Sequence, residues 1–209
     1  MPDNGRTTGD ITLPSEKYQG NIAYAKELGG KAGIDAMRAY NSIRSYSEVD
    51  FRSVSDEVRI PYRPLKTEAE YEKILEDFGD PSTLKGLRLL TYTTTKERIA
   101  YLRSGKEPKT HPIDSQVQFA FNSVVLVPFP YEMFAETTLR LRKLSPFDHT
   151  LRISNCSGAY AYLPSRDQMC RGGYKVGQFE NRYVFANVEN ADDIIIHENL
   201  RIMEKFEDE

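Results

Sequence analysis

The chain has 209 residues, of which 39% are hydrophobic and 28% are charged, and its formal net charge is −3. That length is enough for one domain with a buried core. Lysine and arginine form no basic block and no regular spacing with aromatic residues, so the composition shows no nucleic-acid-binding footprint. No apolar run approaches the roughly 20 residues that span a bilayer, and the polar start lacks the apolar segment of a signal peptide. The cytoplasm is therefore the default expectation for the compartment.

The first elements predicted along the chain are a long helix and a strand. Apolar residues recur at steps of three and four over residues 18–46, which predicts an amphipathic helix. Glycines at 29–33 predict an interruption of that helix. Residues 50–64 alternate with period two and end in two prolines, which is typical of a strand.

Two shorter helices are expected next. Thr67 and Glu70 have the spacing of a capping box, which predicts a helix that begins there and continues to about Phe78. A second helical stretch is expected over residues 94–102, and a loop rich in glycine, proline and lysine follows it.

The second half of the chain mixes strands with helices. Strands are expected over 115–121, 124–127 and 150–154, with a hairpin turn at 122–123, and helices over 132–144 and 191–206. This order predicts an α/β fold, with helices packed on a mixed, layered sheet. The expected domain organisation is a single domain over residues 1–209.

Glu132 is the first candidate for a functional residue. It follows an apolar strand and a Pro-Phe-Pro turn, and the pattern places it in the first turn of the next helix. A carboxylate at a helix N-terminus is favoured by the helix dipole, which contributes about 0.3–1 kcal/mol and accounts for most such glutamates. A carboxylate fixed at the end of a buried strand is also suited to metal binding or general-base catalysis. Both interpretations stay open.

Tyr160, Tyr162 and Tyr174 are the second set of candidates. Tyrosines in a loop after a strand usually pack their rings and leave the hydroxyl at the surface. The same hydroxyls can stabilise an oxyanion or ligate a metal. Arg166 and Asp167 lie between them in sequence, and the glycine pair 172–173 before Tyr174 allows the backbone to approach a neighbour or a ligand closely.

The histidines and cysteines offer little material for a metal site. His111, His149 and His197 are far apart in sequence, and each is better interpreted as a hydrogen-bonding or solvated residue. Cys156 and Cys170 match neither a disulfide framework nor a zinc-binding pair, and Cys156 is expected to be buried. The chain has no Ser/His/Asp order and no phosphate-binding loop.

Four stretches, taken in order, resemble the neutral/alkaline non-lysosomal ceramidase family and its bacterial relatives. These stretches are "TTGDITLPSEKYQG", "VRIPYRPL", "NSVVLVPFPYEMFAETTLRLRKLSPFDHTLRI" and "AYLPSRDQMCRGGYKV". The third is similar to the family's strand, Pro-Gly-Glu turn, helix and Ser-Pro-Phe run. The fourth is similar to its Gly-Tyr-hydrophobic-Pro-Thr-Arg-Glu segment and the Gly-Gly-Tyr-Glu that trails it. The resemblance extends over most of the chain and corresponds to the C-terminal half of the family's catalytic domain.

The resemblance implies a zinc amidohydrolase that cleaves ceramide to a fatty acid and sphingosine, and hence a lipid-like N-acyl amide substrate. In that family two histidines, a glutamate and a tyrosine bind one zinc. Carried over by position, Glu132 and Tyr162 match the zinc-binding glutamate and tyrosine. Tyr174 matches a second tyrosine that approaches the scissile carbonyl, where a zinc-bound water would attack.

The chain also departs from the family pattern. Both zinc-binding histidines belong to the N-terminal half of the family's domain, and no histidine of this chain matches them. Tyr131 replaces the glycine of the Pro-Gly-Glu turn, Ala161 replaces the glycine before the tyrosine, and Lys175 replaces a glutamate. Two ligands are fewer than the three that a catalytic zinc takes, so the chain alone is not expected to hydrolyse amides.

Three hypotheses follow. The chain is half of an enzyme, completed by an N-terminal half supplied in another chain or upstream, and it then exposes apolar surface that favours this partner or self-association. Alternatively it is a catalytically inactive binding or scaffolding module that keeps the ceramidase-like fold. The third hypothesis is a soluble domain whose match to the family is accidental.

Overall fold

The computed structural model describes residues 22–107 and 113–207. Their contacts divide them into two units, one within Asp3–Val49 and one within Asp50–Glu209. The single domain expected over residues 1–209 stays a prediction. Among the described residues, no helix has both the length and the apolar character needed to cross a membrane.

The described part of the first unit contains the helix α2 (Ile22–Ser42), which has no buried residue. The predicted helix is confirmed, but the predicted interruption at residues 29–33 is wrong, because the helix continues through the glycines. A glycine inside a helix costs about 1 kcal/mol relative to alanine, which weakens the helix without ending it. Exposed ion pairs at helical spacing support it, including Glu27 with Lys31 at 2.8 Å.

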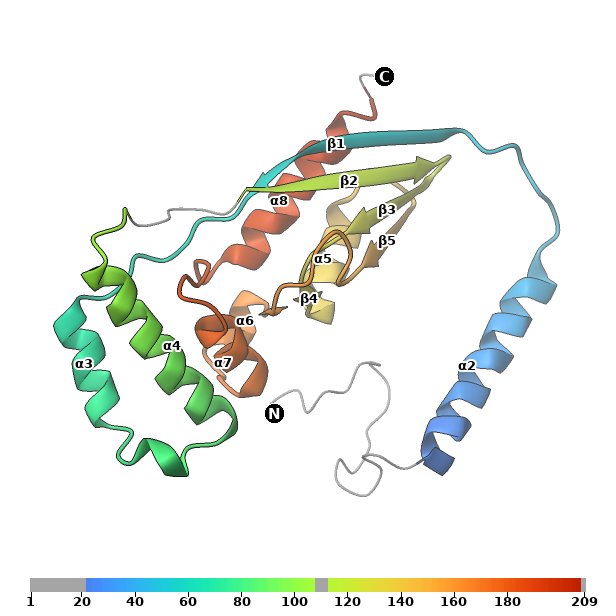
Figure 1. Ribbon diagram of the computed structural model, residues 1–209. Helices are drawn as coiled ribbons and strands as arrows, with labels where there is room; N and C mark the ends of the chain where they lie inside the picture. The colour runs from blue at the N-terminus through green and yellow to red at the C-terminus, as the bar shows by residue number, and fades with distance from the viewer. Residues whose placement is uncertain (1–21, 108–112, 208–209) are drawn as a thin grey trace. The chain divides into compact units, whose positions relative to one another are not determined.

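The second unit is built on a four-stranded sheet with the order β1-β2-β3-β5 (Figure 1). Its strands are β1 (Phe51–Arg59), β2 (Ile113–Phe121), β3 (Val124–Pro128) and β5 (His149–Ile153). The first three strands pair antiparallel, and β5 pairs parallel with β3. The mixed α/β sheet is therefore confirmed. So is the hairpin between β2 and β3, where Asn122 adopts a φ of 52°, a conformation that asparagine tolerates.

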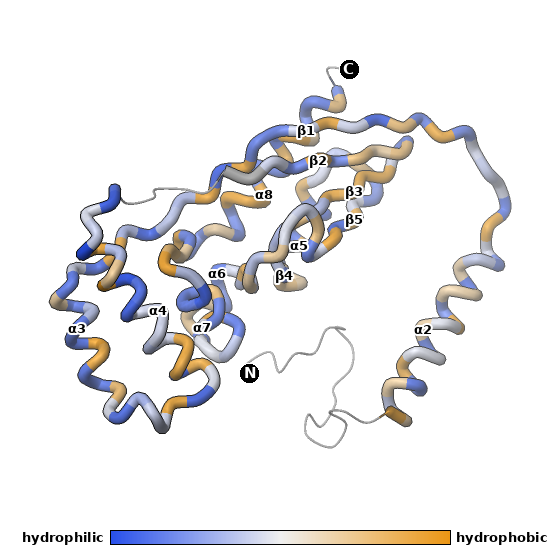
Figure 2. Tube along the Cα trace, viewed as in Figure 1, coloured by the Kyte–Doolittle hydropathy of each residue, from blue (hydrophilic) through white to orange (hydrophobic). Residues whose placement is uncertain are grey.

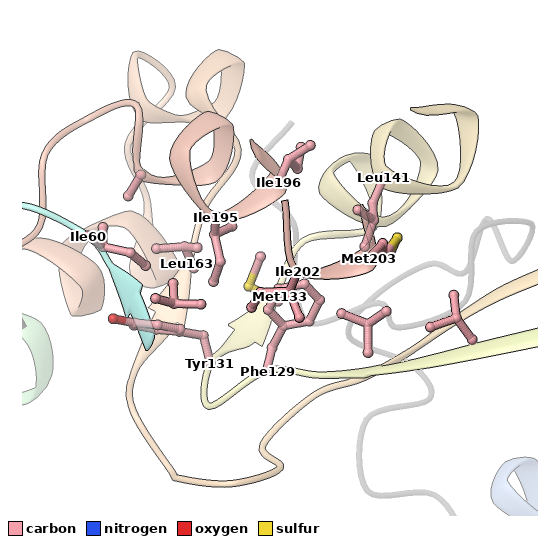
Figure 3. Close-up of a cluster of buried hydrophobic side chains, with 14 of the residues drawn as sticks. Ile60, Phe129, Tyr131, Met133, Leu141, Leu163, Ile195, Ile196, Ile202 and Met203 are labelled. Carbon is pink, nitrogen blue, oxygen red and sulfur yellow. The ribbon is translucent and has the colours of Figure 1, made fainter. Parts of the chain in front are cut away.

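Two helices cover one face of this sheet, α5 (Ala135–Leu144) and α8 (Ala191–Glu204) (Figure 1). The α8 helix packs on β1 and on α5, and α5 packs on β5. Figure 3 shows side chains of these elements meeting in the core, with Phe129 and Ile202 among them. The apolar positions of the helix predicted over 191–206, six in all, are expected to face inward; four of them are buried and two are only partly buried. The four are Ile195, Ile202, Met203 and Phe206, and the two are Ile194 and Leu200.

The opposite face of the sheet is accessible and carries an apolar patch, whereas Ser53, Ser55 and Glu57 make most of its β1 strand polar. Phe51, Leu151 and Ile153 are 55%, 45% and 41% exposed, and the half-buried Phe119 and Leu126 lie between them in the strand register. Figure 2 shows the hydrophobic colour along β3, while hydrophobic and hydrophilic positions alternate on β5. A sheet face that meets water is usually polar, so the apolar patch, rather than the polar part on β1, has the composition of a surface that another layer covers.

A pair of helices, α3 (Glu68–Glu76) and α4 (Gly86–Arg103), follows β1, with the short 3-10 helix η1 (Pro81–Thr83) between them. The predicted capping box is confirmed, because Thr67 and Glu70 bond reciprocally through side chain and backbone. The α4 helix begins earlier than the predicted residue 94. Its first turns are rich in threonine, a weak helix former, and they are held by packing on α3 and on α7 (Tyr174–Asn181).

Candidate functional site

Glu132 and Tyr162 lie directly opposite each other in a small parallel sheet. The strands are β4 (Glu132–Met133) and β6 (Tyr162–Leu163), and their register pairs Glu132 with Tyr162. The expectation that Glu132 occupies the first turn of a helix is wrong. The residue is extended because its backbone N–H donates to the carbonyl of Ala161 at 3.4 Å, and α5 begins only at Ala135.

The two side chains point away from the core. The next residue of each strand, Met133 and Leu163, is buried at 7% and 0% exposure, and both lie in the hydrophobic cluster of Figure 3. Because successive side chains of a strand alternate between its faces, Glu132 and Tyr162 share the opposite face. The two residues that the family resemblance selects as metal ligands are therefore neighbours.

Backbone hydrogen bonds align β4 with β6 over a longer stretch. Phe129 bonds the end of β5 and the segment after it. Its N–H donates to the carbonyl of Ile153 at 2.8 Å, and its carbonyl accepts from the N–H of Cys156 at 2.9 Å. Tyr160 donates its N–H to the carbonyl of Pro130 at 2.6 Å. Gly158 permits this approach, because a Cβ there would lie 2.8 Å from the Pro130 side chain.

Tyr131 takes the place of the glycine that the family's turn has, and the structure shows why its bulk is accepted. The backbone of Tyr131 has no positive φ, so this position does not require glycine. Its ring is buried, with 5% exposure, and lies 5.2 Å from the ring of Tyr160. The turn therefore gains a core side chain where the family has none.

Tyr174 completes the predicted set. It is the first residue of α7, and its ring lies 6.1 Å from that of Tyr162 in an edge-to-face arrangement. The side chain is 59% exposed. The two glycines before Tyr174 adopt left-handed backbone conformations, with φ of 61° at Gly172 and 93° at Gly173. A Cβ on Gly172 would meet nothing within 4 Å, so Gly172 is required for its conformation and not for a close contact.

A shallow cavity of about 190 Å³ opens beside this pair of strands. Its lining includes the predicted residues Glu132, Tyr160 and Tyr162. It also includes Gln178, Arg182 and Tyr183, which carry no motif in the sequence and lie in α7 or directly after it. Gln178 and Arg182 follow Tyr174 at helical spacing, so recognising α7 would have placed them on the same side.

Positive charge lies next to the predicted ligands. The ammonium of Lys175 is 5.3 Å from the ring centre of Tyr162 and 5.4 Å from that of Phe134. Arg182 adds a guanidinium to the cavity wall. Cations over an aromatic face are attracted to it, and the same charges oppose the binding of a second cation nearby.

The remaining candidates lie elsewhere. Arg166 and Asp167 belong to α6 (Arg166–Met169), where hydrogen bonds from Ser165 and Gln168 hold the pKa of Asp167 below its usual range. His149 and His197 are exposed, and His111 lies outside the described residues. Cys156 is half-buried rather than buried, and both cysteines are free.

The described residues do not by themselves fit a catalytic zinc. Glu132 and Tyr162 supply one carboxylate and one phenol, and the described part of the chain has no group of three or more histidine, cysteine, aspartate or glutamate side chains placed to hold a metal. A catalytic zinc takes three protein ligands and a water. The site is at most half of such a centre.

No family model and no curated protein matches the chain. Among solved structures, "Ceramidase complexed with C2" is 10% identical with a TM-score of 0.39, over 46% of this chain and 15% of that one. A neutral ceramidase from Pseudomonas aeruginosa is 13% identical with a TM-score of 0.42, over 75% of this chain and 29% of that one. Both are ceramidases, the family that the sequence motifs resemble, and the chain spans less than a third of the length of either.

Proposed function

We propose that the chain is the C-terminal half of a ceramidase-like zinc amidohydrolase that hydrolyses an N-acyl amide bond when an N-terminal half completes it. The observation that carries the proposal is the pairing of Glu132 with Tyr162 in adjacent strands, with the ring of Tyr174 against Tyr162. The family resemblance selects these same three residues from separate parts of the chain. Glu132 and Tyr162 line one cavity, and Tyr174 reaches the pair through its ring contact with Tyr162, which supports a shared role.

Each residue has a defined part in this proposal. Glu132 and Tyr162 contribute two ligands of the metal, and the other ligands come from the missing half. Tyr174 is exposed at the start of α7, and its hydroxyl donates a hydrogen bond to the carbonyl oxygen of the amide, which gains negative charge during hydrolysis. The chain alone is inactive.

A second candidate function is a catalytically inactive, ceramidase-like binding or scaffolding module. Lys175 and Arg182 favour it, because both bring positive charge to the wall that would face the metal. Lys175 also stands where the family pattern has a glutamate, so the charge at that position is reversed. A chain released from metal binding tolerates such a change.

Zinc titration of the full chain tests the half-site directly. We expect the wild-type chain to bind one zinc weakly, because it supplies only two of the ligands, and Glu132→Gln and Tyr162→Phe to weaken this binding about tenfold or more, because each removes a ligand atom. Isothermal titration calorimetry gives the stoichiometry and affinity. Glu136→Gln and Tyr92→Phe make the same chemical changes at exposed or half-buried positions of α5 and α4 and are expected to leave the affinity unchanged.

A further variant distinguishes the two candidate functions. Lys175→Glu restores the charge of the family pattern, and in a genuine half-site it strengthens zinc binding by removing a cation beside Tyr162. If wild type and Lys175→Glu both fail to bind zinc, or if the Glu136→Gln control weakens binding as much as Glu132→Gln, the half-site proposal is wrong and the module is favoured.

The proposed partner is the missing half, with self-association as the outcome when it is absent. The apolar patch on the outer face of the sheet supports this part of the proposal, because a covering layer would bury it. We expect the isolated chain to self-associate and Leu151→Lys with Ile153→Lys to abolish this, since both side chains are exposed on β5. Sedimentation velocity over a concentration series measures it. Leu139→Lys, at a more exposed position on α5, is the control, and an equal effect there would contradict the assignment.

A further inference from the structure

A second and larger cavity, separate from the candidate site, lies among β1's exit loop, the helices α3 and α4, and the connection between α7 and α8. Its volume is about 310 Å³, which is at the lower end of the range for small-molecule sites. Arg63, Lys66 and Arg98 line it together with one carboxylate, that of Glu180. The lining thus carries three cations against one anion.

Arg98 is the least exposed of these cations, at 9%. It donates to backbone carbonyls, through Nε to Val184 at 2.9 Å and through Nη2 to Glu180 at 2.6 Å. Among the described residues no acceptor bonds its Nη1, and no carboxylate forms an ion pair with it. The ring of Tyr71, 5.8 Å from the guanidinium, partly compensates the charge. A buried guanidinium without a carboxylate is still costly, so a negative ligand in the cavity would be favoured.

Arg63 is also incompletely partnered. Its Nε donates to the carbonyl of Asn187 at 3.0 Å. Its Nη1 lies 3.6 Å and 3.7 Å from carboxylate oxygens of Glu180 and Glu189, which is longer than a hydrogen bond. Its Nη2 is buried and has no hydrogen-bond partner among the described residues. Burial lowers the pKa of Arg98, and the charge of Arg63 lowers it further, so the two guanidinium groups repel each other.

The rest of the wall is mainly apolar. Leu65, Ile74 and Val184 line the cavity beside the charged groups. A ligand that fits this combination has a planar anionic head for the guanidinium donors and a short apolar body. Carboxylates match the donor geometry of arginine and carry a single charge, which suits a site that also contains Glu180.

We propose that this cavity binds a small organic carboxylate, whose head bonds the free donors of Arg63 and Arg98 while Lys66 adds a screening charge at the mouth. The inference does not rest on the proposed hydrolase function, because none of its residues belongs to the candidate site.

Titration of the full chain with sodium benzoate and sodium butyrate, at constant ionic strength set with chloride, tests the proposal. We expect saturable binding that Arg63→Gln and Lys66→Glu weaken about tenfold or more. Lys96→Glu makes the same charge change at an exposed residue of α4 that does not line the cavity, and this variant is expected to bind carboxylates as the wild type does. Inorganic phosphate is titrated in parallel.

The outcomes separate cleanly. The proposal is supported if the chain binds a carboxylate, if Lys66→Glu weakens this binding and if Lys96→Glu leaves it unchanged. Lys66 is exposed, so the Lys66→Glu test remains usable even if Arg63→Gln fails to fold. The proposal is overturned if neither carboxylate binds, if both charge reversals weaken binding equally, or if phosphate binds and the carboxylates do not.

Discussion

Arg98→Met is expected to lower the free energy of unfolding by about 3 kcal/mol, because it removes a largely buried guanidinium that donates to three backbone carbonyls. Arg98 donates to the carbonyls of Glu180, Tyr183 and Val184, which lie at the end of α7 and in the connection that follows it. Thr94, also on α4, donates to the carbonyl of Asn181 at 2.6 Å, but these bonds to Glu180, Tyr183 and Val184 come from the one guanidinium and are lost together. Methionine keeps most of the apolar stem, so the loss reports on the guanidinium.

Urea denaturation followed by circular dichroism measures this change. Arg88→Met, on the exposed side of the same helix, is the matched control and is expected to alter stability by no more than about 0.5 kcal/mol. Arg98→Lys retains the charge but loses the several N–H donors of the guanidinium, so its stability should fall between those of the Arg98→Met and Arg88→Met proteins. Equal stability of the Arg98→Met and Arg88→Met proteins would show that the guanidinium does not hold the connection.

Local sequence signals were sufficient where the hydrophobic period was clear. The period-two strand before Pro61, the hairpin at Asn122 and the apolar face of α8 all follow from patterns within one segment. The α7 helix was missed for a physical reason. It contains Gly177, whose missing Cβ leaves room for the side chain of Leu87, so its stability comes from packing on α4 rather than from its own sequence.

In the candidate site, too, some features could be predicted from local sequence and others depend on tertiary contacts. Motif order selected Glu132, Tyr162 and Tyr174, but strands of two residues carry no periodicity, so neither β4 nor β6 could be predicted. Their pairing depends on contacts between segments about 30 residues apart in the chain, made through the bonds around Phe129 and Pro130. The cations beside Tyr162 were equally hidden, because a lysine in sequence does not reveal which ring it covers.

Asp192→Ala is expected to lower the free energy of unfolding by about 2–3 kcal/mol, because it removes the acceptor that joins three helices. The side chain is fully buried at the start of α8. One of its oxygens accepts from the guanidinium of Arg140 on α5 and from the backbone N–H of Arg166 at the start of α6, both at 2.9 Å. Its other oxygen is buried without a partner among the described residues, which reduces the net stabilisation.

Asp192→Asn separates the charge from the hydrogen bonds. The asparagine oxygen can accept from the same two donors, while its amide takes the position of the unpartnered oxygen, so only the charge is lost. We expect it to destabilise less than Asp192→Ala, and Asp193→Ala, which removes a half-buried neighbour that also pairs with Arg140, to cost about 1 kcal/mol. Thermal and urea unfolding give the order. If Asp193→Ala costs as much as Asp192→Ala, the buried carboxylate is not the element that joins α5, α6 and α8, and the surface ion pair carries the contact instead.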